Sequence, residues 1–121
     1  MTGGCLCGGV RFELDPPLRN VLVCHCSLCR RSGTLAGAYT SVPLEALRLS
    51  AEETLRWYVD VNERRRGFCG TCGATLFWTR ADDAVISVSA GALDGPTGLV
   101  TEGHIYVADA ADWESVQMVD R

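Results

Sequence analysis

Seven cysteines are the residues of this 121-residue chain whose types and spacing could do chemistry. They form three groups, which are Cys5 and Cys7, then Cys24, Cys26 and Cys29, then Cys69 and Cys72. An odd count with such short spacings is not typical of a disulfide framework, whereas thiolates are preferred ligands of zinc. The segment 1–5 also lacks the charged and apolar stretches of a signal peptide, so we expect a reducing, cytoplasmic location. The sequence therefore predicts thiolate-bound metal.

The seven thiols divide naturally into a group of four and a group of three. Four thiolates close a tetrahedral zinc site, whereas three leave a position for water or substrate. In segment 68–74 a glycine follows both Cys69 and Cys72, which lets backbone N–H groups point at the two thiolates as in a zinc knuckle. Cys5 and Cys7 lie between glycines and are the natural partners of this pair, because they would tie the start of the chain to its middle. Other pairings, such as the central cysteines with the knuckle, stay open on spacing alone.

The three central cysteines admit three interpretations. They could hold an open, catalytic zinc, or a closed structural zinc completed by His25 or His104. They could also form a metal-free redox site, with Cys26 and Cys29 as a Cys-x-x-Cys pair. His25 lies between two of the cysteines, so in an extended segment its side chain points away from theirs and packs or supports instead of ligating. We expect His104 to be buried and hydrogen-bonded in a strand.

Composition favours one small globular domain over residues 1–121. Hydrophobic residues make up 47% of the chain, and no apolar run approaches the roughly 18 residues of a membrane span. The net charge is -4 and every basic residue is an arginine. An acidic chain disfavours nucleic acid as a partner, so we interpret the run Arg64–Arg66 as a solvated strand edge.

Frequent short strands and turn signals predict a mainly β fold. Strands are expected over 10–14, 21–24, 35–42, 48–50, 54–59, 64–68, 75–79, 85–89 and 104–107, with the strands 75–79 and 85–89 forming a hairpin. The glycine-rich segment 2–9 is expected to be a loop around a metal, and 108–121 to be weakly patterned with Trp113 as an anchor.

Two helical turns are expected, one over 44–47 and one from Ser27 to Arg31 with Gly33 as its stop. Ser27 would be the N-cap of the second turn. Backbone N–H groups at its start would then point at the central thiols and lower their pKa values.

Several other side chains suit a binding pocket. Arg30 and Arg31 could bind the carboxylates of a glutathione-like ligand, although such a pair more often only solvates a helix end. Trp57, Tyr58 and Trp78 are expected in the core or in a pocket wall, with the core favoured.

Taken together, these motifs resemble the glutathione-dependent formaldehyde-activating enzyme family, which includes centromere protein V-like domains. The matching segments are 4–8, 24–30, 68–73 and 104–106, and their order and spacing span nearly the whole chain. The resemblance implies a zinc-containing, mainly β fold of the Mss4-like kind, with short antiparallel sheets and few helical turns. It also implies a structural zinc at Cys5, Cys7, Cys69 and Cys72, and a second, catalytic zinc at Cys24, Cys26 and Cys29.

The function implied by this resemblance is that of a carbon–sulfur lyase. The family condenses glutathione with formaldehyde to S-hydroxymethylglutathione, which is the lyase reaction run backwards. Because a free thiol with a pKa of about 8.5 is mostly protonated at neutral pH, a zinc with an open position would supply the thiolate. The expected partners are a small-molecule thiol and an aldehyde, with neither nucleic acid nor membrane. The alternative is a non-catalytic, zinc-stabilised binding module.

One departure from the family bears on the substrate. Family members often carry Ser-Lys after the His-Ile-aromatic strand, whereas this chain has Ala108-Asp109 there and contains no lysine. The tail after Trp113 is also short. The sequence therefore leaves open which thiol and which aldehyde are used.

Overall fold

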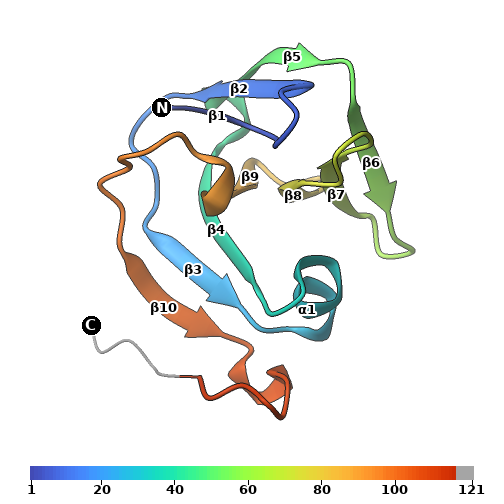
Figure 1. Cartoon of the computed structure of the whole chain (residues 1–121), viewed down its shortest axis with the longest axis vertical. Helices are drawn as coiled ribbons and strands as arrows, with labels where there is room; N and C mark the ends of the chain where they lie inside the picture. Colours follow the sequence, from blue (N-terminus) through green and yellow to red (C-terminus); the bar gives the residue numbers. More distant parts are fainter. Residues whose placement is uncertain (117–121) are drawn as a thin grey trace.

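The computed structural model describes residues 1–116, which form two β-sheets (Figure 1). The small sheet has the strand order β1-β2-β5, with β1 at Thr2–Gly4, β2 at Val10–Leu14 and β5 at Leu47–Glu52. The large sheet has the order β10-β3-β4-β9-β8-β7-β6. Its strands are β3 Val21–Cys24, β4 Gly37–Pro43, β6 Leu55–Val59, β7 Arg64–Cys69, β8 Thr75–Arg80, β9 Val85–Ser89 and β10 Thr101–Ile105. The fold is thus mainly β and Mss4-like, as expected.

Helical structure in the described residues is short. The α-helix α1 spans Ser27–Gly33, and single 3-10 turns occur at Leu44–Ala46, Ala90–Ala92 and Val107–Asp109. No helix in the described part of the chain is long and apolar enough to cross a membrane. The helical turns predicted at 27–31 and 44–47 are confirmed by α1 and by the first of these 3-10 turns.

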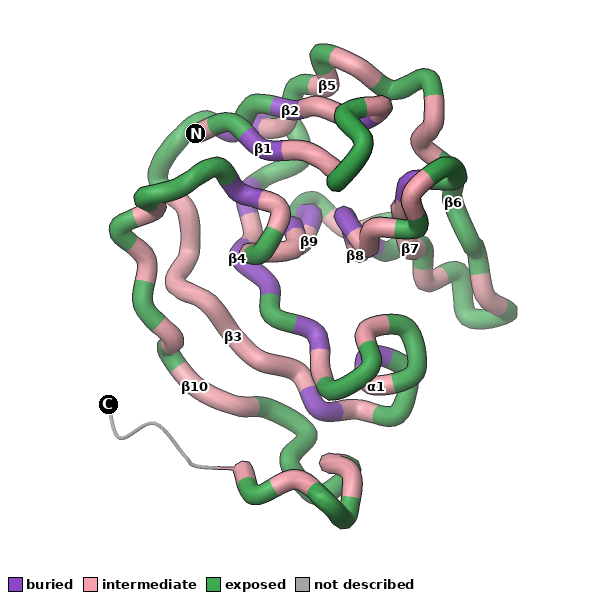
Figure 2. The backbone as a smooth tube through the Cα atoms, viewed as in Figure 1, coloured by how far each residue is buried: buried purple, intermediate pink, exposed green. Residues whose placement is uncertain are grey.

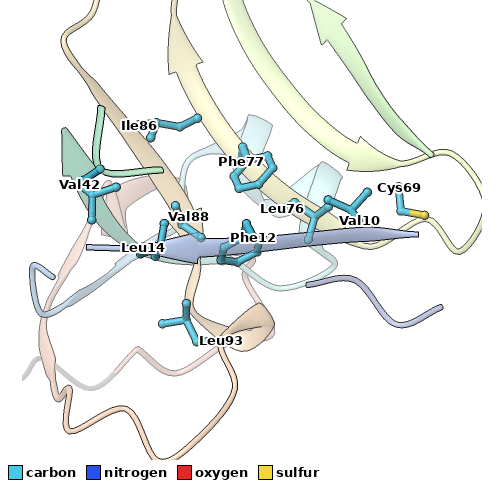
Figure 3. Packing of buried hydrophobic residues seen from close by; sticks show 11 residues of the cluster. Val10, Phe12, Leu14, Val42, Cys69, Leu76, Phe77, Ile86, Val88 and Leu93 are labelled. Carbon is cyan, nitrogen blue, oxygen red and sulfur yellow. The ribbon is translucent and has the colours of Figure 1, made fainter. Parts of the chain in front are cut away.

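The hydrophobic core lies between the two sheets. In β2, Val10, Phe12 and Leu14 are buried, while the residues between them reach the surface, as the period of a strand requires. The Phe12 ring meets Phe77 of β8 edge to face, with the ring centroids 5.4 Å apart. Figure 3 shows these side chains meeting, with Cys69 at one end of the cluster. Figure 2 shows the buried positions concentrated on β2, β4, β8 and β9.

The opposite face of the large sheet is available for a site. Because Phe77 faces the core, the adjacent Trp78 points to the other side of the sheet. The register pairs Trp78 with Ser87 on β9 and with Arg66 on β7, so these three side chains share that side. Figure 1 shows the small sheet on one side of β4, β9, β8 and β7, and α1 on the other. Core and site therefore occupy opposite faces of one sheet.

Three expectations about the strands were wrong. Residues Thr2–Gly4 form β1 instead of a loop, and a Cβ on Gly3 would lie 2.5 Å from the Phe12 ring, so glycine allows this strand to pack closely. Arg64–Cys69 is not an edge, because β6 pairs with its outer side. The pairing of β10 with β3 is parallel, so the large sheet is mixed and not purely antiparallel.

The ends of the sheet also differ from expectation. Strand β10 stops at Ile105, because Tyr106 has a left-handed backbone with φ of 54° and a 3-10 turn follows. Trp57 and Tyr58, expected in the core, are 42% and 61% exposed because they lie on the edge strand β6. Trp113, the expected anchor, is 68% exposed, and the last part of the predicted tail, 117–121, lies outside the described residues.

Replacing Phe77 by alanine should lower the free energy of unfolding by about 3–5 kcal/mol, because Phe77 is fully buried and contacts both sheets. Urea denaturation of the metal-loaded protein measures this difference. Val61→Ala serves as the control, because Val61 is 98% exposed and its loss should change stability by no more than about 0.5 kcal/mol. A Phe77 variant as stable as the control would contradict the assignment of the core.

Candidate metal centres

Two connections, one from each sheet, bring four cysteines together. Their Sγ atoms all lie within 4.8 Å of one another, and we call Cys5, Cys7, Cys69 and Cys72 the four-cysteine group. The Sγ–Sγ distance is 3.7 Å from Cys5 to Cys7 and 3.6 Å from Cys7 to Cys69. Four sulfurs placed 2.3 Å from one tetrahedral zinc would be about 3.8 Å apart. The four-cysteine group is therefore placed to hold one tetrahedral metal ion and fits zinc.

Hydrogen bonds prepare these sulfurs to carry negative charge. The backbone N–H groups of Cys72 and Thr71 donate to Cys69 Sγ over 3.3 and 3.4 Å, and the Thr54 hydroxyl lies 3.2 Å from the same sulfur. The hydrogen bond from the Cys72 N–H has the largest effect on Cys69, and that from the Thr54 hydroxyl has the next largest. Such hydrogen bonds lower the pKa of Cys69 to about 5. Gly73, with φ of 78°, turns the chain so that the knuckle closes. The sequence had indicated this geometry through its two glycines.

The four thiols of this group oppose one another's ionisation. Cys7 accepts from the Gly9 N–H, which lowers its pKa, but the thiols of Cys69 and Cys5 act in the opposite direction and raise it to about 11. Neighbouring sulfurs thus compete for the negative charge, and only a cation between them removes the competition. A bound cation would therefore allow the four sulfurs to be ionised together.

A second cluster forms where β3 passes into α1. Cys24 ends the strand, Cys26 caps the helix and Cys29 lies within it, and their Sγ atoms also lie within 4.8 Å of one another. We call these residues the three-cysteine group. Ser27 was wrongly expected as the N-cap. Cys26 takes that place because its sulfur accepts the Cys29 N–H over 3.3 Å.

Burial and helix geometry act against each other on these thiols. Burial raises the pKa of Cys24 to about 12 and also raises the pKa of Cys29. Burial is also the largest single effect on Cys26 and acts to raise its pKa, but the backbone N–H of Cys29 and the other hydrogen bonds to this sulfur together outweigh burial, so that pKa falls. The expected lowering by the helix start therefore holds for one thiol and is wrong for the other two. The guanidinium of Arg66 supplies a positive charge, with Nη2 3.8 Å from Cys29 Sγ and Nη1 3.3 Å from Ser32 Oγ.

Within residues 1–116 no fourth Cys, His, Asp or Glu joins the three-cysteine group. His25 is only 3% exposed, and its Nε2 lies 2.9 Å from Nδ1 of His104 on β10. Burial, reinforced by the charge of His104, lowers the pKa of His25, and the two rings are joined by one hydrogen bond between these nitrogens. His25 thus supports β10 against β3, and His104 is half-buried in its strand. The three sulfurs leave one side of a bound ion open.

That open side faces a cavity of about 460 Å³. Small-molecule sites commonly measure about 300–1,000 Å³. The cavity follows the face of the large sheet described above, and its lining besides the cysteines includes Arg19, Leu22, Tyr39, Arg66, Trp78 and Asp109. The positively charged side chains that line the cavity thus include Arg66 and Arg19, whereas Arg30 and Arg31 are not among the lining residues. Sequence reasoning missed Arg19, Tyr39 and Arg66. Strand alternation within 64–69 was the available signal for Arg66.

Comparisons with known proteins agree with this geometry. Residues 1–109 match the family described as "Glutathione-dependent formaldehyde-activating enzyme". Among solved structures, a crystal structure of a Rhodobacter sphaeroides protein from a structural genomics programme is similar at a TM-score of 0.65. The two sequences are 28% identical, and the match covers 81% of this chain and 92% of the other.

Cys69→Ser and Cys29→Ser should each remove one metal ion per chain, because each takes a thiolate from a different group. The Cys69 variant should also lower the melting temperature more, since its group joins the two sheets. Elemental analysis and thermal unfolding measure the two effects. Unchanged metal content in both variants would contradict the assignment of the two groups.

Thr54→Val should weaken metal binding by the four-cysteine group about tenfold or more, because the lost hydroxyl raises the pKa of Cys69 and protons then compete better with the metal. The measurement is competition with a chromogenic chelator in a Cys29→Ser background, which isolates this group. Thr54→Ser keeps the hydroxyl and should bind as the parent does. Equal affinities for the valine and serine variants would count against the hydrogen bond.

Proposed function

Because the chain belongs to the glutathione-dependent formaldehyde-activating enzyme family, we propose that it is a zinc-dependent carbon–sulfur lyase. Its substrate is a thiol–aldehyde adduct such as S-hydroxymethylglutathione. One observation carries this proposal, namely that three cysteines with no fourth ligand in residues 1–116 open onto a cavity of about 460 Å³. A purely structural second metal would need no such opening, which disfavours a non-catalytic binding module.

The reaction needs a sulfur that leaves and attacks as a thiolate. In the lyase direction the C–S bond breaks, the electron pair stays on sulfur, and the hydroxyl of the adduct loses a proton as the C=O bond forms. Bound zinc would hold the substrate sulfur as a thiolate near neutral pH. Cys24, Cys26 and Cys29 would hold the ion, and Arg66 offsets part of their negative charge through Cys29. The sheet face behind the cavity keeps bulk water from one side of the reacting atoms.

Charges in the cavity favour a thiol that carries carboxylates. Arg19, Arg64 and Arg66 line it, although the chain as a whole has a net charge of -4. Arg64 is paired with Asp60 over 2.9 Å, and Arg19 donates to the Tyr39 carbonyl, which holds both side chains in place. Guanidinium groups bind carboxylates well. Glutathione has two carboxylates, so it fits these groups.

Asp109 adds a negative charge at the position where family members often have a lysine. A carboxylate there favours a substrate with an ammonium group, which glutathione also carries. The free thiols that this chemistry requires fit a reducing compartment such as the cytoplasm.

Cys26→Ser should lose one metal ion and at least about 100-fold in kcat/KM, because the substrate sulfur then has no metal to hold it. The measurement is the rate at which glutathione and formaldehyde exchange with their adduct, followed by magnetisation-exchange NMR. Circular dichroism and the melting temperature check that the variant is folded. Full activity and full metal content in this variant, or no rate acceleration by the wild-type chain, would overturn the proposed function.

A further inference from the structure

Tyr39 places its hydroxyl group at the cavity, beside the guanidinium of Arg66. The residue is only 7% exposed and lies on β4, in the middle of the face of the large sheet that lines the cavity. Its side chain lines the cavity, and the side chain that approaches its hydroxyl as a hydrogen-bond partner within residues 1–116 is Arg66, which can donate but cannot accept. Because Arg66 can only donate to the hydroxyl oxygen, the hydroxyl proton stays available for a ligand in the cavity.

The hydroxyl lies beside the three-cysteine group. Gly37 pairs directly with Cys24 across β4 and β3. The Tyr39 ring folds back over Gly37, so a Cβ there would overlap the ring and would lie 3.1 Å from the hydroxyl oxygen. Glycine at position 37 thus lets the hydroxyl reach the strand position next to the first thiol of the group.

The electrostatic surroundings keep the proton on this hydroxyl. Burial raises the pKa of Tyr39, and the nearby charge of Cys29 acts in the same direction. Arg66 acts against them but does not reverse the shift. A tyrosine hydroxyl with its ordinary pKa of about 10 is already protonated at neutral pH, so Tyr39 is a hydrogen-bond donor there.

Several other donors near the thiols already have partners or are exposed to solvent. Arg66 already contacts Cys29 Sγ and Ser32 Oγ. His25 and His104 bond to each other. Ser27 lines the cavity, but it is exposed to solvent, so its hydroxyl is not held in one direction.

We propose that Tyr39 is a catalytic residue whose hydroxyl donates a hydrogen bond to the aldehyde-derived oxygen of the adduct. This inference rests on the proposed lyase function. In condensation, the thiolate pair forms the C–S bond, the carbonyl π pair moves to oxygen, and that oxygen then takes a proton from water, releasing hydroxide. Tyr39 stabilises the negative charge as it develops on the oxygen, and in the lyase direction the same steps run in reverse. The adduct oxygen is two bonds from sulfur, which matches a donor beside the thiol group.

Tyr39→Phe in the full-length, metal-loaded chain tests this role. We expect kcat for glutathione and formaldehyde exchange to fall about 100-fold, which is typical for the loss of one donor to a developing oxyanion. Metal content and the Kd of glutathione alone, measured by calorimetry, should stay within twofold, because glutathione lacks the adduct oxygen. Tyr58→Phe is the matched control, since Tyr58 is 61% exposed on β6 and outside the cavity lining.

Gly37→Ala provides a second test, because it keeps the hydroxyl but displaces the ring. It should lower kcat with little change in metal content. Ser27→Ala tests the rival donor. If the loss of kcat follows Ser27 and not Tyr39, the inference is wrong.

The possible outcomes separate the inference from the function on which it rests. An active wild-type chain with a fully active Tyr39→Phe variant overturns the role of Tyr39 alone. A Tyr39→Phe variant that also loses metal or glutathione binding shows a structural role and overturns it as well. A wild-type chain without activity overturns both the function and the inference.

Discussion

The constraint that shapes the rest of this structure is the crowding of four sulfurs within 4.8 Å of one another, where ionised thiolates would be subject to repulsion. The four-cysteine group takes two ligands from the connection between β1 and β2 and two from the connection between β7 and β8. These connections belong to different sheets, so a cation that removes the repulsion also clamps the sheets together. Cys69 is itself fully buried and belongs to the hydrophobic cluster (Figure 3). A metal bound there would therefore stabilise the same end of the molecule as the core packing does.

One face of the large sheet packs in the core, so the other face is left to line the cavity. Alternation along β4 places Thr40 and Val42 in the interior and Tyr39 toward the cavity. The same alternation along β8 separates Phe77 from Trp78. A small domain thus obtains a rigid cavity wall from strands that its core already holds in place. The helix α1 then sets two of the three central cysteines above that wall.

Local patterns in the sequence predicted much of this arrangement. Glycines after Cys69 and Cys72 indicated the knuckle, and alternation predicted β2 and the β8–β9 hairpin. The division of the thiols into four and three also matches how the structure groups them. These features depend on neighbours within a few residues, which a linear pattern records.

Features that depend on distant pairing could not be predicted in this way. The parallel pairing of β10 with β3 brings His104 to His25 across 79 residues, and no local signal specifies it. Trp57 was expected inside because it is aromatic, yet its exposure depends on β6 being the last strand of the sheet. Arg66 was interpreted as part of a solvated run, but its pairing with Trp78 places its side chain on the side of the sheet that lines the cavity.

The sequence separation of the ligands gives metal binding at the two candidate centres different effects on the folding equilibrium. The ligands of the three-cysteine group lie within one short stretch, so an unfolded chain can also bind metal there, and such binding adds little to the preference for the folded state. The four-cysteine group joins Cys7 to Cys69 across 62 residues, and an unfolded chain must close that long loop before it can bind. Scarcity of metal would thus deplete the two centres with different consequences. Loss at the first would leave the folding equilibrium nearly unchanged, whereas loss at the second would shift the folding equilibrium itself.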